Sequence, residues 1–385
     1  MKNSLLCASV AVATIGLLFY NVMPLYLGQL QESTGLTTGQ IGFVASAFFF
    51  GFNLISFSSY YWVRKVPVLW TSLAGTLLLI VCLLATGYAD GFTFQVFITA
   101  IIGSVSGAVS SIGITIAGDA DNNTRWYGIQ VAAEAAAGVA LLFLLPVTLI
   151  PIYGFQGLIY GMILLMLVIL PSYWYLTRTI HVSRKYKETE SIGKSDHAIQ
   201  TNIHAIMGLI AMAFLFVGSA AVWAFVERIA AINEFDPEAV GSLLGISLFF
   251  SVLGSLIAGA LGNRYGNLRP YLFNCLLLVA GVITIAVTDD LLIYAVGACL
   301  FMLGWAAAFA FLFAIIADVD PDGNYISLSV PALGVGSMIG PGMAGLLLSG
   351  GSTLPLLTMC LGTVAVSMIF SWLGGRGAES PARQT

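Results

Sequence analysis

The segment AGDADNNTRWYG, residues 117–128, returns in altered form as ADVDPDGNYI, residues 317–326. Asp119 of the first copy recurs 199 positions later as Asp318 of the second. The offset also relates Asp121 to Asp320, Trp126 to Tyr325 and, far upstream, Gly42 to Gly241. One offset kept over positions so far apart indicates a chain built from two related halves.

The composition is that of a membrane protein. Hydrophobic residues make up 59% of the 385 residues and charged residues 8%, whereas soluble domains have roughly 45–50% and about 25%. A membrane-spanning helix needs roughly 20 apolar residues, so the chain has room for about twelve. The apolar run after Lys2 continues uncharged to Gln31 without the cleavage site of a signal peptide, and we interpret it as the first helix.

Charged or Gly/Pro-rich breaks divide the chain into twelve predicted helices. They are expected at residues 5–30, 38–62, 68–88, 93–117, 126–149, 153–176, 204–230, 239–261, 268–287, 291–316, 325–349 and 352–374. The breaks at 151–154 and 350–352 carry no charge, but the repeat brings them to equivalent positions and so supports both. The sequence therefore predicts an all-α membrane protein with six helices in each half.

The one long polar stretch, 178–203, is expected to link two six-helix bundles, 1–177 and 204–385. Lys and Arg fall on one side of the predicted helices, and only Arg228 falls on the other. Because cytoplasmic loops carry the excess of Lys and Arg, both termini are expected in the cytoplasm. We therefore expect a multi-pass protein of the bacterial cytoplasmic membrane.

The stretch GALGNRYGNLR, residues 259–269, resembles the G-x-L-x-D-R-x-G-R-R/K signature of the major facilitator superfamily. Asn263 stands where the family usually has Asp, and Asn267 where it usually has a basic residue. The matching positions are Gly259, Leu261, Arg264 and Gly266.

The resemblance covers the whole chain and implies the fold of that family, two six-helix bundles that carry small-molecule solutes through the lipid bilayer. It implies a gating or structural role for Gly259, Arg264 and Gly266 in the turn between helices eight and nine. The equivalent turn of the first half keeps Arg64. In style the chain is closest to drug and metabolite efflux members, and we expect a monomer.

Glu134 lies about eight residues, or roughly 12 Å, inside the fifth predicted helix. A charged acid at that depth costs about 2.5–3.5 kcal/mol, so it should face a cavity, pair, or hold a proton. Burial favours the neutral carboxyl, which would let Glu134 take up and release a proton as a cavity opens to either side. The alternative is a neutral carboxyl that only hydrogen-bonds a neighbouring helix.

Gln130 lies one turn before Glu134 and therefore on the same helix face. The repeat places Ser329 and Leu333 at the equivalent positions, so this polar pair belongs to one half only. A solute without twofold symmetry needs polar groups on one side of a site between the repeats, and the asymmetry favours a site role. Asn21 in the first helix is also unmatched and is a further candidate for binding the solute.

Glu227 and Arg228 lie near the outer end of the seventh predicted helix, where the first half has Gly28 and Gln29. Both are candidates for substrate binding at the outer mouth of the cavity. For Arg228 the alternative is a side chain that only reaches to the membrane surface.

Aromatic side chains recur every four residues on the tenth predicted helix, at Trp305, Phe309 and Phe313, and Trp223 lies on the seventh. Helical spacing of aromatics usually means packing. In the family that the chain resembles, helices one, four, seven and ten border the cavity. Trp223, Trp305 and Phe309 are therefore also candidates for a pocket that binds an apolar or ring-bearing solute.

Because Asp119 and Asp318 occur in both halves, a structural role is expected for them. They are predicted to cap helices five and eleven and to pair with nearby arginines. A calcium loop is not expected, since the terminal bidentate Glu is missing at the required spacing. The five cysteines lie in apolar stretches without metal-ligand spacing, so no metal site is expected.

The stretch 334–345, GVGSMIGPGMAG, is interpreted as close helix packing through small residues.

Together these features predict a secondary transporter of a small organic solute, driven by the proton gradient through Glu134, with export favoured over uptake. Two alternatives stay open: a proton-driven importer of a metabolite or anion that uses Arg228, and a non-transporting membrane sensor or assembly factor. No GxxxxGK[ST] loop and no Ser/His/Asp set occurs in the helices, so an ATP-driven pump acting alone, an enzyme, a cofactor and a nucleic-acid partner are not expected.

Overall fold

The computed structural model describes residues 3–88, 91–118, 123–176, 202–261, 264–320, 325 and 328–375, which form helices and no strand. Twelve helical segments of this described part are long and apolar enough to cross a membrane. The helices are α1 (Asn3–Thr34), α2 (Thr38–Trp62), α3 (Val68–Thr86), α4 (Phe92–Gly118), α5 (Asn123–Val147), α6 (Ile150–Tyr153), α7 (Phe155–Ile169) with the 3-10 turn η1 (Leu170–Tyr175), α8 (Ile203–Ile232), α9 (Pro237–Leu261), α10 (Leu268–Val287), α11 (Leu291–Asp318), α12 (Ser329–Leu348) and α13 (Leu354–Gly375). The predicted all-α protein with twelve transmembrane helices is confirmed.

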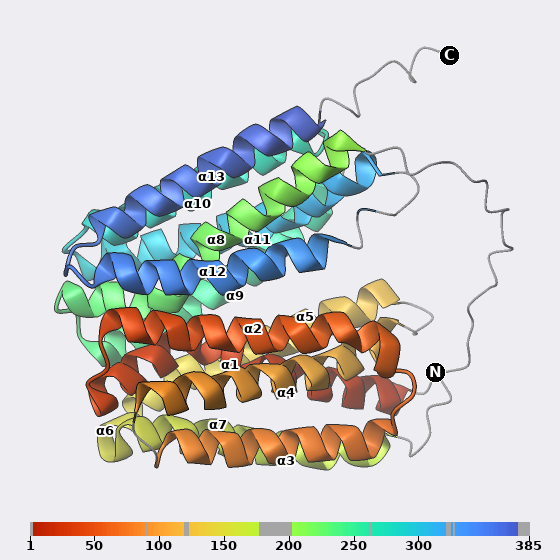
Figure 1. Ribbon diagram of the computed structural model, residues 1–385, viewed down its shortest axis with the longest axis vertical. Coiled ribbons are helices and arrows are strands. Elements are labelled where there is room, and N and C mark those ends of the chain that lie inside the picture. Colours follow the sequence, from red (N-terminus) through yellow and green to blue (C-terminus); the bar gives the residue numbers. More distant parts are fainter. Residues whose placement is uncertain are drawn as a thin grey trace, which may run out of the picture.

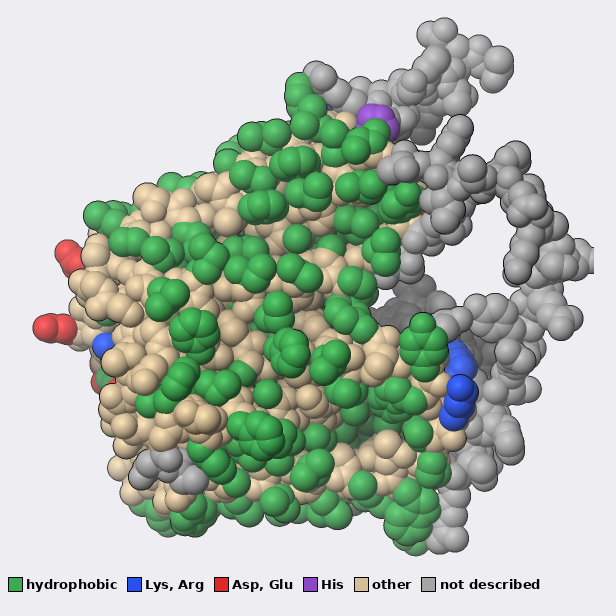
Figure 2. Space-filling model, viewed as in Figure 1, with side chains coloured by type: hydrophobic (Ala, Val, Ile, Leu, Met, Phe, Trp, Pro, Cys, Tyr) green, Lys and Arg blue, Asp and Glu red, His purple; other side chains and the backbone are tan. Residues whose placement is uncertain are grey.

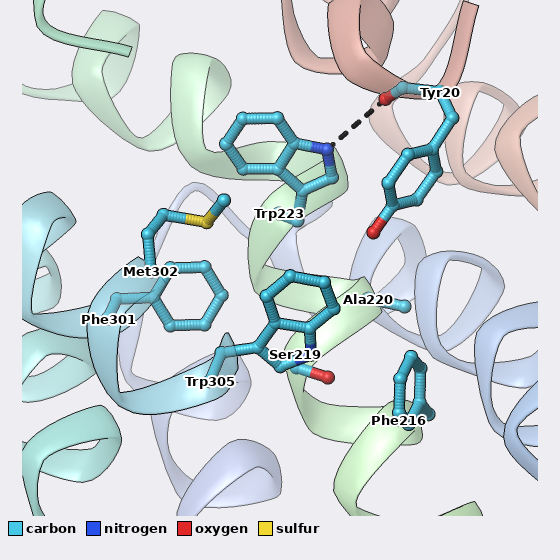
Figure 3. A pocket seen from close by; sticks show the side chains of 8 residues that line it. All are labelled: Tyr20, Phe216, Ser219, Ala220, Trp223, Phe301, Met302 and Trp305. Atoms are coloured by element: carbon cyan, nitrogen blue, oxygen red, sulfur yellow. Dashed lines mark hydrogen bonds between the residues drawn. The ribbon is translucent and has the colours of Figure 1, made fainter. Parts of the chain in front are cut away.

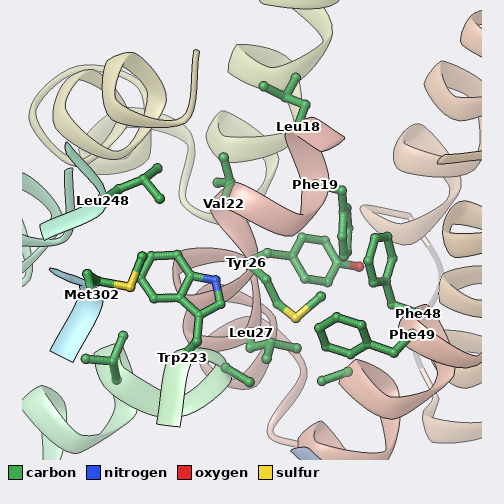
Figure 4. Packing of buried hydrophobic residues seen from close by; sticks show 14 of the residues in the cluster. Leu18, Phe19, Val22, Tyr26, Leu27, Phe48, Phe49, Trp223, Leu248 and Met302 are labelled. Atoms are coloured by element: carbon green, nitrogen blue, oxygen red, sulfur yellow. The ribbon is translucent and has the colours of Figure 1, made fainter. Parts of the chain in front are cut away.

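The helices form two bundles that lie side by side (Figure 1), the first from α1 to α7 and the second from α8 to α13. Contacts between the bundles run chiefly through α2 against α12 and α5 against α9, with α1 against α8 between them. The buried apolar side chains form a cluster that continues across this interface. In Figure 4 Trp223 of α8 lies close to Val22 of α1, Leu248 of α9 and Met302 of α11.

Both uncharged breaks between predicted helices are real turns. α5 ends at Val147, and Gly154 with φ +57° separates the short α6 from α7. α12 ends at Leu348, and Gly351 with φ +75° precedes α13. Glycine suits both positions because it adopts positive φ without a Cβ clash.

The 199-residue repeat is visible in the packing between the bundles. A Cβ on Gly42 of α2 would lie 2.5 Å from the carbonyl oxygen of Pro341 and 2.9 Å from Cα of Gly345, both on α12. A Cβ on the repeat partner Gly241 of α9 would lie 2.9 Å from the carbonyl oxygen of Leu142 and 2.2 Å from Cγ of Pro146, both on α5. The offset carries Leu142 to Pro341 and Pro146 to Gly345. The two halves therefore make the same contact twice.

The two ends of the molecule differ in charge. α1 begins and α13 ends at one end, which we call the basic end because its described turns and helix ends carry Arg64, Lys65, Arg264 and Arg269. The turns and helix ends at the other, acidic end carry Glu32, Glu234, Asp236, Glu238 and Asp290. Figure 2 shows the largest group of Lys and Arg side chains at the basic end and Asp and Glu side chains at the other. The charge pattern of the sequence predicts this separation, and the orientation of the basic end toward the cytoplasm stays a prediction.

The bundles meet most closely at the acidic end. Gly39, Gly42 and Gly241 all lie in the first turns of α2 or α9 at this end, and each faces the opposite bundle. In Figure 1 the helices of the second bundle incline away from the first toward the basic end. Local caps fix the helix starts here: Thr37 and Gln40 form a reciprocal capping box on α2.

Candidate functional site

A proline in the first helix creates a hydrogen bond between the bundles. Pro24 lies inside α1 and has no amide hydrogen, so it cannot donate to the carbonyl of Tyr20 one turn earlier. That carbonyl instead accepts a hydrogen bond from Nε1 of Trp223 on α8, at 3.3 Å (Figure 3). The bond joins the two bundles in the middle of their long central helices.

A small cavity adjoins this bond. Its lining comes from α1, α8 and α11 (Figure 3) and consists of Tyr20, Phe216, Ser219, Ala220, Trp223, Phe301, Met302 and Trp305. None of these side chains carries a formal charge at neutral pH. The cavity volume is about 10 Å3, room for about one water molecule, so α1 must move away from α8 and α11 before a solute can enter.

The polar pair on α5 is buried beside the same region of α1. Gln130 and Glu134 expose 4% and 8% of their surface, and Nε2 of Gln130 donates to Oε1 of Glu134 at 2.8 Å. Asn21 is also buried, and its Nδ2 donates to the backbone oxygen of Glu134 at 2.9 Å. Tyr20 and Asn21 are neighbours in sequence, so one turn of α1 is bonded both to α8 and to α5.

The predicted aromatic residues of α11 lie together. Trp305 and Phe309 have ring planes within 6° of parallel and centroids 6.1 Å apart, and Phe313 continues the row at 4.9 Å from Phe309. Phe216 of α8 packs edge-on against both Trp305, at 6.0 Å, and Phe309, at 5.3 Å. Trp223 and Trp305 both line the cavity, whereas Phe309 supports Trp305 from outside it.

Glu227 and Arg228 lie at the closed acidic end rather than at an open mouth. Glu227 exposes 7% of its surface, and its Oε2 has no hydrogen-bond partner among the described residues. Its carboxyl rests on Gly28 of α1, where an added Cβ would lie 1.9 Å from Oε2. Arg228 is half-buried, and its Nε is likewise without a partner in the described part of the chain. In this closed arrangement the two residues line no open mouth, and their role in binding the solute stays a prediction.

The turn between α9 and α10 needs the glycine that the resembled signature has at position 266. Gly266 has φ +69°, a conformation that other residues adopt at a cost. Gly259 lies in α9 with no atom within 4 Å of an added Cβ, and Arg264 is exposed. Arg64, in the corresponding turn of the first half, is exposed as well.

Gly266 and Gly259 form a matched pair for a measurement of the free energy of unfolding. We expect Gly266→Ala to lower the free energy of unfolding by about 1–2 kcal/mol, since a Cβ in the left-handed region is strained. Gly259→Ala should instead be neutral or raise it by about 0.5–1 kcal/mol through helix propensity. Thermal unfolding of both variants in one detergent tests this; equal shifts would show that the turn conformation is not required.

The predicted capping role of Asp318 is wrong. The helix that Asp318 was predicted to cap, the eleventh predicted helix, is α12. Its N-cap is Leu328, which makes no side-chain cap, whereas Asp318 is the last residue of α11. Oδ2 of Asp318 accepts a hydrogen bond at 2.7 Å from Nδ2 of Asn267, which stands where the resembled family has a basic residue. An amide thus binds the aspartate across α10 and α11 in place of the predicted arginine. Asp119 lies outside the described residues.

The glycines of α12 confirm the prediction of close packing. Gly336 and Gly340 lie against backbone atoms of α8, and Gly342 and Gly345 lie against α2. The amide of Gly342 also donates to Oγ of Ser46 at 2.8 Å. α12 therefore packs within its own bundle through one face and across the interface through another.

Three contributors to the site were not predicted. Phe216 carried no signal beyond being an apolar helix residue. Asn53 bridges the bundles through its Nδ2, which donates to the carbonyl of Gly334 at 3.3 Å, and its polar character in an apolar helix was available as a signal. Pro24 was also visible, because a proline inside a helix always leaves the carbonyl one turn earlier without its amide donor.

Known proteins resemble the chain in fold and not in sequence. No family model and no curated protein sequence matches the chain. The crystal structure of the nucleoside transporter NupG superposes with a TM-score of 0.73 at 14% sequence identity, over 98% of this chain and 99% of that one. A bacterial homologue of the human lysosomal transporter Spinster, in an inward-facing and occupied conformation, superposes with a TM-score of 0.72 at 13% identity, over 99% and 100%. The chain thus has the fold of major facilitator transporters, as the signature implied.

Proposed function

We propose that this protein is a secondary transporter that moves a small organic solute across the bacterial cytoplasmic membrane by alternating access. It acts as a monomer, uses the proton gradient as its energy source and needs no cofactor. The observation that carries the proposal is the buried pair of Gln130 and Glu134 on α5. Asn21 of α1 donates a hydrogen bond to the backbone of Glu134, and the preceding residue, Tyr20, accepts the hydrogen bond from Trp223 of the other bundle. The fold, shared with solved transporters, supports it.

The bonds around α1 suggest how solute and proton sites communicate. With the basic end in the cytoplasm, the present arrangement is closed to the outside. Opening that side would separate α1 from α8 and would break the bond from Trp223 to Tyr20. Because Asn21 is the next residue of α1, the same movement would change the surroundings of Glu134.

The Gln130 amide suits both protonation states of Glu134. An ionised carboxyl accepts hydrogen bonds, whereas a protonated one also donates. Nε2 of Gln130 already donates to Glu134, and Oε1 of Gln130 has no partner among the described residues and can accept after a rotation of the amide. The pair can therefore hold or release a proton without leaving Glu134 unpaired.

We propose export as the direction of net transport, because the cavity lining is aromatic and weakly polar and suits a solute that enters from the membrane or cytoplasm. Arg228 offers one specific observation for the alternative. Its partly buried guanidinium with an unpartnered Nε lies at the acidic end, where an anion taken up from outside would first arrive.

The experiment begins with a thermal-shift screen of the purified protein against metabolites and drugs, since a ligand of the folded state raises its apparent stability. The best ligand is then offered to everted and to right-side-out membrane vesicles with an imposed pH gradient. Accumulation in everted vesicles with an acidic lumen is expected. Accumulation only in right-side-out vesicles with acid outside would establish import, and no flux in either would remove the transport proposal.

A further inference from the structure

Trp305 presents a buried hydrogen-bond donor that nothing in the described protein accepts. Its Nε1 is inaccessible to solvent and has no hydrogen-bond partner among the described residues. The other indole of the cavity, that of Trp223, is bonded to the carbonyl of Tyr20. A buried N–H without a partner is unfavourable, and native proteins keep few of them. The cavity therefore contains one indole that is held by the protein and one that is free to bind a ligand.

The surfaces around this donor are flat and aromatic. Trp305 and Phe309 have nearly parallel ring planes, and Phe216 packs edge-on against both. In Figure 3 the ring of Trp305 lies next to Ser219, with Phe216 on one side and Phe301 on the other. Flat π-surfaces bind other planar rings by stacking or by edge-to-face contact, which adds to the gain from apolar burial.

The remaining polar groups restrict the ligand further. The hydroxyl of Ser219 donates to the carbonyl of Leu215 at 2.8 Å. The hydroxyl of Tyr20 points into the cavity in Figure 3 and makes no hydrogen bond to a described residue. No lining side chain is charged, so a charged ligand would lose its hydration here without compensation. The lining thus offers ring surfaces, two hydroxyl oxygens that can donate or accept, and one group, the N–H of Trp305, that can only donate.

We infer that the transported solute is an uncharged, planar aromatic or heteroaromatic molecule, which stacks in the α8–α11 aromatic cluster and accepts a hydrogen bond from Nε1 of Trp305. This inference rests on the proposed transport function and names its substrate class. The half-buried row Trp305, Phe309 and Phe313 leads from the cavity along α11 toward the basic end and provides ring surfaces along the route. Trp305 is then the residue that sets specificity for acceptor-bearing rings.

The test compares two probes of one shape, quinoline and naphthalene, which differ by a single ring nitrogen acceptor. Binding to the purified full chain is measured by ligand-observed NMR at equal probe concentrations, kept below the aqueous solubility of naphthalene. We expect quinoline to bind the wild type about tenfold more tightly than naphthalene, the effect of one hydrogen bond. In Trp305→Phe, which keeps a ring but lacks the N–H, the two probes should bind alike, with naphthalene changed less than about twofold.

Trp174→Phe is the matched control, because Trp174 is 89% exposed at the surface of the first bundle and lines neither described cavity. It should keep the preference for quinoline. Each probe partitions into micelles to the same extent with every variant, so at constant detergent the change in preference from the wild type to Trp305→Phe does not depend on that partition. Trp305→Leu, which removes the ring as well, should weaken both probes. Equal binding of the two probes to the wild type, a preference that survives in Trp305→Phe, or no binding of either probe overturns the inference.

Failure of this inference and failure of the transport proposal are distinguishable. Probe binding that depends on Trp305 without flux in vesicles would keep the ligand class and remove transport. Flux of a charged, non-aromatic solute that Trp305→Phe leaves unchanged would keep transport and remove the ligand class.

Discussion

Glu134→Gln is expected to abolish proton-driven accumulation of the solute while leaving its binding and its exchange down a gradient in place. Gln has the size of a protonated Glu and can keep a hydrogen bond to Gln130, so the packing of α5 against α1 should not change. The variant cannot take up or release a proton at this position. Accumulation ratios in pH-gradient vesicles should therefore fall to the equilibrium value, whereas counterflow under equal pH should persist.

One control variant accompanies Glu134→Gln. Glu238→Gln removes an exposed acid in the first turn of α9 at the acidic end and should leave accumulation unchanged. Loss of ligand binding in Glu134→Gln would assign Glu134 to the solute rather than to the proton. Full accumulation by the variant would exclude Glu134 as the coupling residue and leave the buried pair with a structural role only.

The overall architecture was predictable because it depends on features that repeat. Apolar runs of spanning length set the number of helices, and the 199-residue offset located the two uncharged breaks. The same offset relates Gly42 to Gly241, and the structure shows both glycines in the same kind of contact with the opposite bundle. Such contacts are determined by helix pairing, which the two halves share.

The contacts that were not predictable depend on the conformational state of the protein and on which side chains meet between helices. The sequence identifies Glu227 as an unmatched acid, but its burial against Gly28 follows from the closure of the acidic end in this conformation. Asp318 was assigned to a helix cap from its residue type and repetition, yet its carboxylate accepts a hydrogen bond from Asn267 in the adjacent turn. Cross-helix bonds between side chains far apart in sequence leave no local pattern.

Closure of the acidic end requires a glycine at position 42, and Gly42→Ala is therefore expected to shift the protein toward the arrangement that is open there. The atoms that an added Cβ would meet at 2.5 and 2.9 Å belong to the backbone of α12, which cannot turn aside as a side chain can. Overpacking of this kind costs about 1–3 kcal/mol. Because that cost falls only on the closed state, the ratio of open to closed molecules should rise about tenfold for each 1.4 kcal/mol.

Spin-label distances can measure this shift without a substrate. Ser33 and Ser352 are exposed at the acidic end, one in each bundle, and labels on cysteines placed there in a cysteine-free background report its opening. Labels at Lys65 and Arg269 report the basic end in the same way. Gly42→Ala should lengthen the first distance and shorten the second, because alternating access couples opening at one end to closure at the other.

Gly39→Ala is the control that distinguishes a clash of the added Cβ with the α12 backbone from the general effect of replacing a glycine in α2. Gly39 lies one turn before Gly42 on α2, but an added Cβ there would lie 3.3 Å from Oγ of Ser349 and 3.5 Å from Cδ2 of Leu346, both side-chain atoms that can rotate away. The nearest backbone atom, the carbonyl oxygen of Gly345, is at 3.9 Å, an ordinary van der Waals contact, so both label distances should stay at their wild-type values. If Gly39→Ala and Gly42→Ala gave the same distances, backbone contact between α2 and α12 would not be what holds the acidic end closed. If only Gly42→Ala opens this end, the contact that both halves of the repeat supply is the one that sets the conformational equilibrium.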